Sequence, residues 1–215
     1  MHIKGVLFDM DGVLLESEDF IARAAIMMFK ERGLDVKQED FKPFVGAGED
    51  RYLGGVAEKY NHPYKIDELK KRAYDIYDQL VAGKLKPLEG VPEFIEKCRK
   101  KGLRLAVATS ADERKMLINL RETGLNSNTF DALVNGSEVK KKKPNPDIFI
   151  LAAKKINLKP DECLVVEDAI NGVDAARNAG AKCLALTTSF NKEDLKEADW
   201  IAGNLKEAPE EAINW

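Results

Sequence analysis

The chain has 215 residues, which is enough for one core domain together with a modest second domain. Its formal net charge at pH 7 is −3, so we expect no overall electrostatic attraction to nucleic acid or to an anionic membrane surface. Three widely separated cysteines without a CxxC pair, and only two histidines, argue against a disulfide framework and against a zinc site.

Short apolar runs alternate with amphipathic stretches along most of the chain. The expected strands are residues 3–8, 104–108, 132–135, 163–166, 183–186 and 200–202. The helix-like stretches between them are residues 92–101, 111–123, 146–156 and 171–179. Strands that alternate with helices predict a doubly wound parallel sheet, that is, a Rossmann-like α/β fold with helices on both faces.

Residues 16–86 break this alternation because they contain no convincing strand. Their helical patterns lie at residues 19–32, 49–60 and 67–81. We therefore expect an inserted all-α cap domain at residues 16–86, seated over one edge of the sheet. The Rossmann-like core would then consist of residues 1–15 and 87–215.

Polar side chains follow four of the expected strands, where a parallel sheet usually binds its ligands. In chain order these residues are Asp9 and Asp11, Thr109 and Ser110, Lys143, and Glu167 and Asp168. Each group alone has an ordinary explanation, such as a solvated turn, a helix N-cap or a solvated lysine loop. The specific signal is the combination, with each group placed after its own strand.

This combination meets the needs of phosphoryl transfer. A carboxylate can attack phosphorus and form an aspartyl-phosphate. Asp11, two residues after Asp9, can act as a general acid on the leaving oxygen and then as a base for water. Lys143, the Thr109 hydroxyl and nearby backbone N–H groups can stabilise the charge of the transferring group. Mg²⁺ suits such a site because it prefers oxygen ligands, commonly one or two carboxylates with waters and phosphate.

At these residues the chain resembles the haloacid dehalogenase superfamily of phosphatases and phosphomutases. The four motifs are FDMDGV (residues 8–13), VATS (107–110), Lys143 in KKPNPDIF, and VVEDAINGV (165–173). The helical insert directly after the first motif is similar in position to the cap of the β-phosphoglucomutase-like branch. The resemblance covers essentially the whole chain and implies the fold described above.

The resemblance implies roles in phosphoryl transfer for the residues that match the motifs. Asp9 would be the nucleophile and Asp11 the general acid/base. Thr109, with Ser110 beside it, would bind the transferring phosphoryl group. Lys143 would orient Asp9 and neutralise the phosphate.

The resemblance also implies a Mg²⁺ cofactor. Asp9 and the backbone carbonyl of Asp11 would be ligands of the metal. Asp168 would hold it directly or through water, and Glu167 would assist. Dehalogenases of this superfamily lack the aspartate at position 11, so its presence favours phosphate over halide chemistry.

The stretch GAGEDR (residues 46–51) has two readings in the cap. A glycine-rich loop that begins at Gly46 and ends in a cation at Arg51 suits closure over a phosphorylated substrate. Alternatively, the stretch is a helix start with Glu49 and Asp50 in the first turn and Arg51 in solvent. The sequence leaves both readings open.

Three other functions share part of this pattern. A sugar phosphomutase of the β-phosphoglucomutase type has the same core residues, but its cap histidine is matched here by Ile21, which favours hydrolysis. A phosphorylated signalling receiver would carry its acids in a different order and would lack the insert. A catalytically idle binding protein is the third alternative.

The expected function is therefore Mg²⁺-dependent hydrolysis of a small phosphate monoester, such as a sugar phosphate or a similar metabolite. We expect a small phosphorylated metabolite as the partner, with no nucleic acid and no membrane, and a monomer or weak dimer. The chain begins with a strand-like run rather than a signal segment, and no apolar stretch is long enough to span a bilayer. These features predict a cytoplasmic location.

Overall fold

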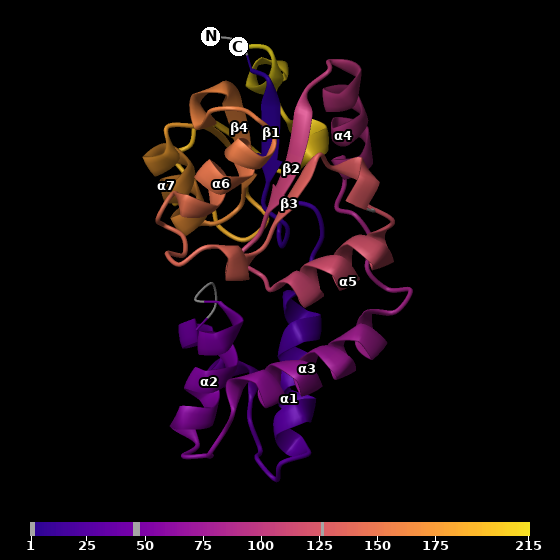
Figure 1. Ribbon diagram of the computed structural model, residues 1–215, viewed down its shortest axis with the longest axis vertical. Coiled ribbons are helices and arrows are strands. Elements are labelled where there is room, and N and C mark those ends of the chain that lie inside the picture. The colour runs from indigo at the N-terminus through magenta and orange to yellow at the C-terminus, as the bar shows by residue number, and fades with distance from the viewer. Residues whose placement is uncertain (1–2, 45–47, 126) are drawn as a thin grey trace.

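The computed structural model describes residues 3–44, 48–125 and 127–215. Its described strands form one six-stranded sheet in the order β3-β2-β1-β4-β5-β6, in which every neighbouring pair is parallel (Figure 1). The strands are β1 (Gly5–Phe8), β2 (Arg104–Ala108), β3 (Ala132–Val134), β4 (Cys163–Glu167), β5 (Lys182–Leu186) and β6 (Trp200–Ala202). The doubly wound parallel fold expected from the sequence is confirmed.

Helices cover both faces of this sheet. Helices α4 (Val91–Lys100) and α5 (Glu113–Thr123) contribute to the hydrophobic core of one face, and α6 (Asp147–Lys155) and α7 (Ile170–Ala179) to that of the other. Strand β1 supplies both cores by alternation, because Val6 and Phe8 belong to the first and Leu7 to the second. Burial on both faces explains why the strand sequences are apolar without strict alternation.

Helix α4 illustrates how the sequence specifies these elements. Pro92 stands in its first turn, where a missing N–H costs nothing. Val91, Phe94, Ile95 and Cys98 are its buried residues, and this spacing gives one apolar face. Burial of each large apolar side chain stabilises the fold by about 1.5–3 kcal/mol.

Strand β3 is one residue shorter than expected, because Asn135 leaves the strand to cap the following turn. Its side chain accepts a hydrogen bond from the backbone N–H of Ser137 at 3.0 Å, which starts the short 3-10 helix Gly136–Glu138. The side-chain pattern alone does not distinguish a last strand residue from such a cap.

The insert after β1 contains helices α1 (Glu18–Lys30), α2 (Glu49–Lys59) and α3 (Ile66–Val81). These helices share a hydrophobic core of their own, which includes Phe29, Phe41 and Tyr77. They lie beyond the carboxyl ends of the strands, at the lower end of the view in Figure 1. The short 3-10 helices Gln38–Asp40 and Lys42–Phe44 connect α1 to α2.

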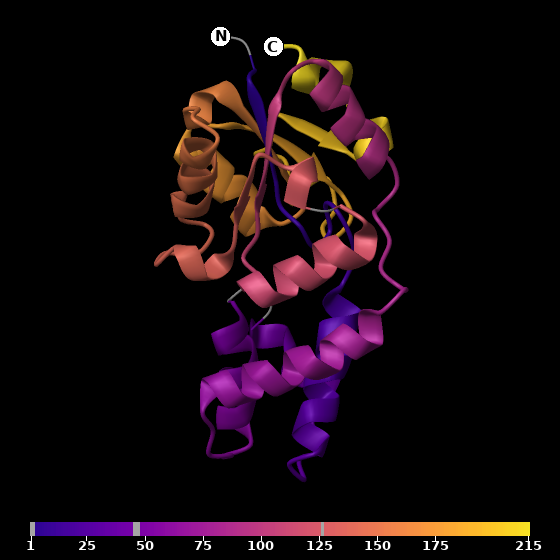
Figure 2. The ribbon, with the colours of Figure 1, turned by 45° about the vertical axis from the view of Figure 1, so that its right-hand side comes forward.

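Helix α5 joins the core to the insert, because it lies alongside α3 in both ribbon views (Figure 2). Arg114 of α5 forms an ion pair with Asp75 of α3 at 2.6 Å. Tyr77 of α3 donates a buried hydrogen bond to the side-chain oxygen of Asn119 of α5. These contacts fix the helices of the insert over the carboxyl edge of the sheet.

Two smaller expectations concern the cysteines and the membrane. All three cysteines are free and buried, as expected for thiols within apolar runs. None of the helices in the described ranges combines the length and apolar character that a bilayer crossing requires.

Candidate active site

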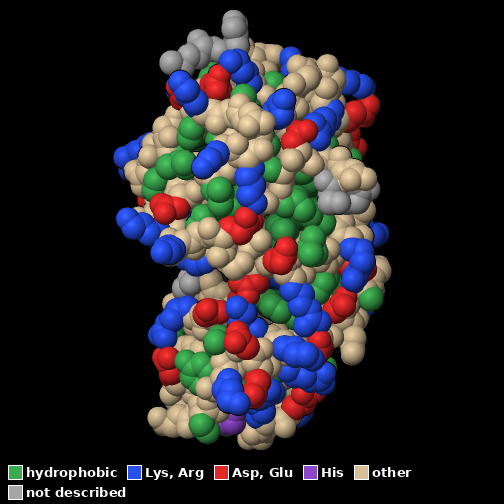
Figure 3. Space-filling model, in the orientation of Figure 1, with side chains coloured by type: hydrophobic (Ala, Val, Ile, Leu, Met, Phe, Trp, Pro, Cys, Tyr) green, Lys and Arg blue, Asp and Glu red, His purple; other side chains and the backbone are tan. Residues whose placement is uncertain are grey.

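A cavity of about 360 Å³ lies between the carboxyl edge of the sheet and the helices of the insert. The outline of the molecule narrows at this level in the space-filling view (Figure 3). The predicted site residues on its wall are Asp9, Asp11, Thr109, Ser110, Lys143, Glu167 and Asp168. Four separate loops of the core therefore bring their polar residues to one cavity, as the order of the motifs predicts.

Asp9 and Lys143 form the centre of the site. The ammonium of Lys143 donates a hydrogen bond to Asp9 Oδ1 at 2.5 Å and another to Glu167 Oε1 at 2.6 Å. Burial raises the pKa of Asp9 to about 7, although Lys143 acts in the opposite direction. Burial also opposes the charge of Lys143, but Asp9 and Glu167 outweigh it and raise the pKa of this lysine.

Both oxygens of the Glu167 carboxylate accept hydrogen bonds from the protein. Its Oε2 accepts hydrogen bonds from the backbone N–H groups of Asp168 at 2.8 Å and Ala169 at 2.9 Å, while Oε1 accepts from Lys143. Gly172 permits this position, since a Cβ there would stand 1.8 Å from Glu167 Oε1. Glu167 thus contacts Lys143 and the start of α7, and its expected part in holding the metal stays a prediction.

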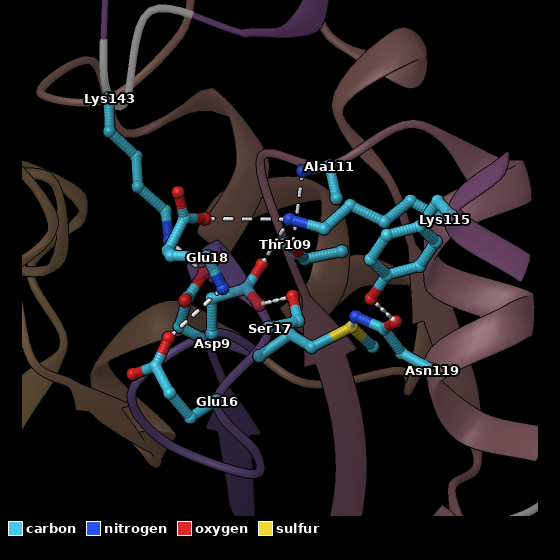
Figure 4. A network of polar contacts seen from close by, with 12 residues as sticks. Asp9, Glu16, Ser17, Glu18, Thr109, Ala111, Lys115, Asn119 and Lys143 are labelled. Atoms are coloured by element: carbon cyan, nitrogen blue, oxygen red, sulfur yellow. Dashed lines mark hydrogen bonds and ion pairs between the residues drawn. The ribbon is translucent and has the colours of Figure 1, made fainter. Parts of the chain in front are cut away.

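Asp11 is held by two side chains that the sequence analysis did not single out. Its Oδ2 accepts a hydrogen bond from Lys115 Nζ at 2.9 Å, and its Oδ1 accepts one from the hydroxyl of Ser17. Lys115 also lies 3.5 Å from Glu18 Oε1. Figure 4 shows Lys115 and Lys143 approaching the carboxylates from opposite sides of the site. The two aspartates of the DxD motif thus have separate lysine partners.

Thr109 follows β2 and is buried at the cavity wall. Its backbone N–H donates to Val134 O at 3.0 Å, and its hydroxyl oxygen accepts a hydrogen bond from the Ala111 N–H at 3.1 Å. Ser110 follows it on the wall of the same cavity. The Thr109 hydroxyl keeps its own proton available for a phosphoryl oxygen, because its contact with Ala111 uses only a lone pair.

Asp168 approaches the loop of the DxD motif from β4. Gly12 has a φ of 74° and leaves room for this carboxylate, because a Cβ at Gly12 would stand 1.9 Å from Asp168 Oδ2. Ser189, from the loop after β5, donates a hydrogen bond to the same oxygen. Burial, with smaller effects of Glu167 and Asp9, raises the pKa of Asp168 to about 8.

Asp9 and Asp168 are two carboxylates of the cavity that could hold a metal ion. The described residues contain no group of three or more His, Cys, Asp and Glu side chains arranged to hold a metal ion. Mg²⁺ needs fewer, since it is commonly bound by one or two carboxylates and completes its shell with water and phosphate oxygens. The high pKa values of Asp9 and Asp168 indicate a buried pair that a divalent cation would stabilise.

Arg51, which was expected to contact substrate from the cap, is not among the described residues of the cavity wall. Gly46 lies outside the described residues. Arg51 forms an ion pair with Glu58 at 2.8 Å and lies over the ring of Phe44, with its side chain 52% exposed. Helix α2 begins at Glu49, so the helix-start reading of this stretch is the one that the structure supports. We do not retain Arg51 as a substrate ligand.

The sequence of residues 6–186 matches the family model of haloacid dehalogenase-like hydrolases. The chain belongs to this family. Three similar proteins illustrate the relationship. The protein SUPPRESSOR OF QUENCHING 1, chloroplastic, of Arabidopsis thaliana is 43% identical in an alignment of 202 residues that covers 91% of this chain. The chain spans only 19% of the length of that relative.

A phosphorylated carbohydrates phosphatase of Thermotoga maritima is 31% identical and matches 99% of this chain and 97% of its own. Among solved structures, CbbY of Rhodobacter sphaeroides in complex with xylulose-1,5-bisphosphate superposes with a TM-score of 0.87 at 25% identity, over 99% of this chain and all of that one. Proteins of the β-phosphoglucomutase type also share the fold. The family and branch expected from the motifs are confirmed.

From the sequence, no role in the site was assigned to several polar residues of the cavity wall, among them Lys115, Glu49 and Ser189. Lys115 and Glu49 line it from α5 and α2, and Ser189 lines it from the loop after β5. The position of Lys115 could have been noticed in the sequence. Lys115 and Asn119, four residues apart, lie on the buried face of α5 with Met116 and Leu120, where polar residues are unusual. Ser189 carried no signal, since a serine after a late strand is typical of any loop.

Proposed function

We propose that the chain hydrolyses a small phosphate monoester, of the sugar phosphate type, through an aspartyl-phosphate on Asp9. The observation that supports this most strongly is the convergence of Asp9, Thr109, Lys143 and Asp168 on one cavity. The similarity to a phosphorylated carbohydrates phosphatase over nearly the whole chain favours the same reaction class.

Each residue has a task in this proposal. Asp9 Oδ attacks phosphorus while Lys143, 2.5 Å from Oδ1, fixes the orientation of the carboxylate. Thr109 donates its hydroxyl proton to a phosphoryl oxygen. Asp11, held by Lys115 and Ser17, gives a proton to the leaving oxygen and later takes one from the attacking water.

Mg²⁺ is the cofactor that we propose. Asp9 and Asp168 would hold it together with the backbone carbonyl of Asp11, since these are the oxygen ligands that Mg²⁺ prefers. When bound, it would supply positive charge next to the oxygens of the transferring group. The protein residues supply the nucleophile, the acid/base and the orientation.

A sugar phosphomutase remains the alternative. Ile21 lines the cavity where a mutase of the related branch would have a histidine. The only described basic group in contact with Asp11 is Lys115, which belongs to the core rather than to the cap. This arrangement favours hydrolysis.

We further propose the domain division at residues 16–86, with the core at residues 1–15 and 87–215. The separate hydrophobic core shared by α1, α2 and α3 supports it. A monomer or weak dimer and a cytoplasmic location stay predictions.

Phosphate release from p-nitrophenyl phosphate and from a panel of sugar phosphates tests the function. We expect turnover that EDTA abolishes and Mg²⁺ restores. Asp9→Asn should abolish turnover without loss of the fold, whereas Asp161→Asn, at an exposed position in the 3-10 helix before β4, should not. Turnover by pure Asp9→Asn would disprove the nucleophile assignment, and formation of an isomerised sugar phosphate instead of inorganic phosphate would favour the mutase.

A further inference from the structure

We propose that the cavity selects phosphate monoesters whose alcohol part carries hydrogen-bond donors and no second anionic group, and that Glu49 makes this selection. This inference rests on the proposed phosphatase function and narrows its substrate class. It depends on three features of the cavity: an unpartnered buried carboxylate, the pairing of every lysine on the wall, and apolar side chains that line the same cavity.

Glu49 is the first residue of α2 and lines the cavity opposite the loops of the core. The residue is only 9% exposed. Its carboxylate has no hydrogen-bond or ion-pair partner among the residues that the structure describes, although buried polar groups in proteins are almost always satisfied. The oxygens of Glu49 are not among the enclosed unsatisfied atoms of the described residues, so they are open to the cavity, and their donors are water or the alcohol part of a bound ligand. Sugar hydroxyls or an ammonium group would supply such donors.

Both lysines of the described cavity wall already form ion pairs with carboxylates of the protein. Within the described residues the wall carries seven carboxylates but only two lysines. Lys143 is bound by Asp9 and Glu167, and Lys115 is bound by Asp11 and Glu18. Near Asp9, the positive charge of a metal ion would offset the negative charge of the transferred phosphoryl group. A second anionic group on the substrate would therefore meet the carboxylates of Glu49 and Glu18 without a cation to pair it.

The alternative cations nearby are directed elsewhere. Arg51 pairs with Glu58, and Lys70 pairs with Asp50 at 2.7 Å and with Asp112 at 2.5 Å. Neither residue is on the cavity wall. Recruiting either of them for a second phosphate or a carboxylate would require breaking the ion pairs that hold it.

Apolar side chains line the same cavity as Glu49. Ile21 and Tyr52 come from the insert, and Phe190 comes from the loop after β5. Such surfaces pack against the C–H faces of a sugar or polyol, while a single carboxylate orients its hydroxyls. This combination recognises an uncharged or cationic alcohol by its hydrogen-bond donors.

Three substrates of the same size and phosphate position test the selection. They are glucosamine 6-phosphate, glucose 6-phosphate and 6-phosphogluconate, whose alcohol parts carry an amino group, only hydroxyl groups, and a carboxylate. The assay is phosphate release by the complete chain with Mg²⁺ at pH 8, above the value of about 7 to which burial raises the pKa of Glu49. We expect kcat/KM for each of the first two to exceed that for 6-phosphogluconate by about tenfold or more.

Glu49→Gln tests whether Glu49 is responsible, since the amide has similar size and lacks the negative charge. We expect it to reduce the preference for glucosamine 6-phosphate over 6-phosphogluconate by about tenfold. Glu39→Gln is the matched control, because it neutralises an exposed glutamate of the insert without breaking the ion pairs of Arg51 or Lys70, and it should leave the preference as in the wild type. The wild-type comparison needs no variant, so the inference stays testable if Glu49→Gln does not fold.

The outcomes separate this inference from the proposed function. Equal or better hydrolysis of 6-phosphogluconate by the wild type would overturn the selection and leave the phosphatase intact. A preference that Glu49→Gln does not reduce would overturn the role of Glu49. A complete lack of phosphate release, including from p-nitrophenyl phosphate, would overturn both proposals.

Discussion

Lys115 Nζ lies 2.9 Å from Asp11 Oδ2, so a buried ammonium on α5 holds the second aspartate of the DxD motif. The side chain of Lys115 is 3% exposed. Burial opposes its charge, but Asp11 and Glu18 outweigh that effect and keep the pKa of Lys115 above its ordinary value. The same helix contacts α3, so the residue that orients Asp11 lies where the core and the insert meet.

The first prediction concerns this contact. Lys115→Met retains most of the apolar length of the side chain but removes its charge. We expect kcat to fall at least about tenfold with a smaller change in KM, because Asp11 loses the partner that orients it. The loss of a buried charge-assisted hydrogen bond should lower the free energy of unfolding by roughly 1–3 kcal/mol.

Steady-state kinetics and thermal unfolding check this prediction. Lys154→Met, at an exposed position of α6, is the control and should match the wild type in both measurements. A Lys115→Met protein with wild-type kcat and reduced stability would assign Lys115 a purely structural role.

The central residues of the site could be predicted because the local sequence determines where they lie in the fold. Asp9, Thr109 and Asp168 each follow an apolar strand directly, so parallel pairing alone brings them to one edge. Glu49 and Lys115 could not be placed in the same way. Their side chains reach the cavity only through the packing of α2 and α5, and a charged residue on an amphipathic helix is usually in solvent. The expectation that Arg51 lies at the substrate depended on the packing of α2 in the same way, and in the structure its side chain pairs with Glu58 instead.

The second prediction is a pH dependence of stability in the metal-free protein. Asp9 and Asp168 have pKa values of about 7 and about 8 in the fold, against an ordinary value of 3.8. The folded state therefore binds more protons than the unfolded state between about pH 4 and pH 8, and the free energy of unfolding falls as pH rises through this window. In EDTA we expect the melting temperature to decrease from pH 5 to pH 8.

Mg²⁺ should reverse this trend because it binds the ionised pair. At a Mg²⁺ concentration one hundred times its dissociation constant, binding adds about 2.7 kcal/mol to the free energy of unfolding. Because the ionised pair is more populated at pH 8 than at pH 5, the increase in melting temperature should be larger at pH 8. Calorimetry at both pH values measures it. In the double variant Asp9→Asn, Asp168→Asn the melting temperature should respond less to pH and to Mg²⁺. A wild-type response in that variant would contradict the assignment of both aspartates.

The third prediction follows from the position of Arg51. Its ion pair with Glu58 is exposed, and such pairs contribute about 0–1 kcal/mol. We expect Arg51→Ala to change kcat/KM for any sugar phosphate by no more than about twofold. Kinetics on the substrate panel check this, with Glu49→Gln as the comparison. A tenfold, substrate-dependent loss in Arg51→Ala would return Arg51 to the binding site.

The fourth prediction concerns Gly172, where two effects oppose each other. Alanine in place of glycine in a helix normally stabilises it by about 0.5–1 kcal/mol. At Gly172, however, the added Cβ would stand 1.8 Å from Glu167 Oε1, the oxygen that accepts the hydrogen bond from Lys143. Since Glu167 is buried with its other oxygen bound to two backbone N–H groups, it has little freedom to move.

We therefore expect the steric effect to dominate in Gly172→Ala. The free energy of unfolding should fall by roughly 1–3 kcal/mol, and kcat should fall at least about tenfold because Lys143 loses one of its two carboxylate partners. Arg177→Ala, at an exposed site of the same helix, should change stability by no more than about 0.5 kcal/mol. Glu167→Gln should reproduce the kinetic defect without the added Cβ. If Gly172→Ala is instead more stable and fully active, Glu167 can be displaced freely and does not hold Lys143 in place.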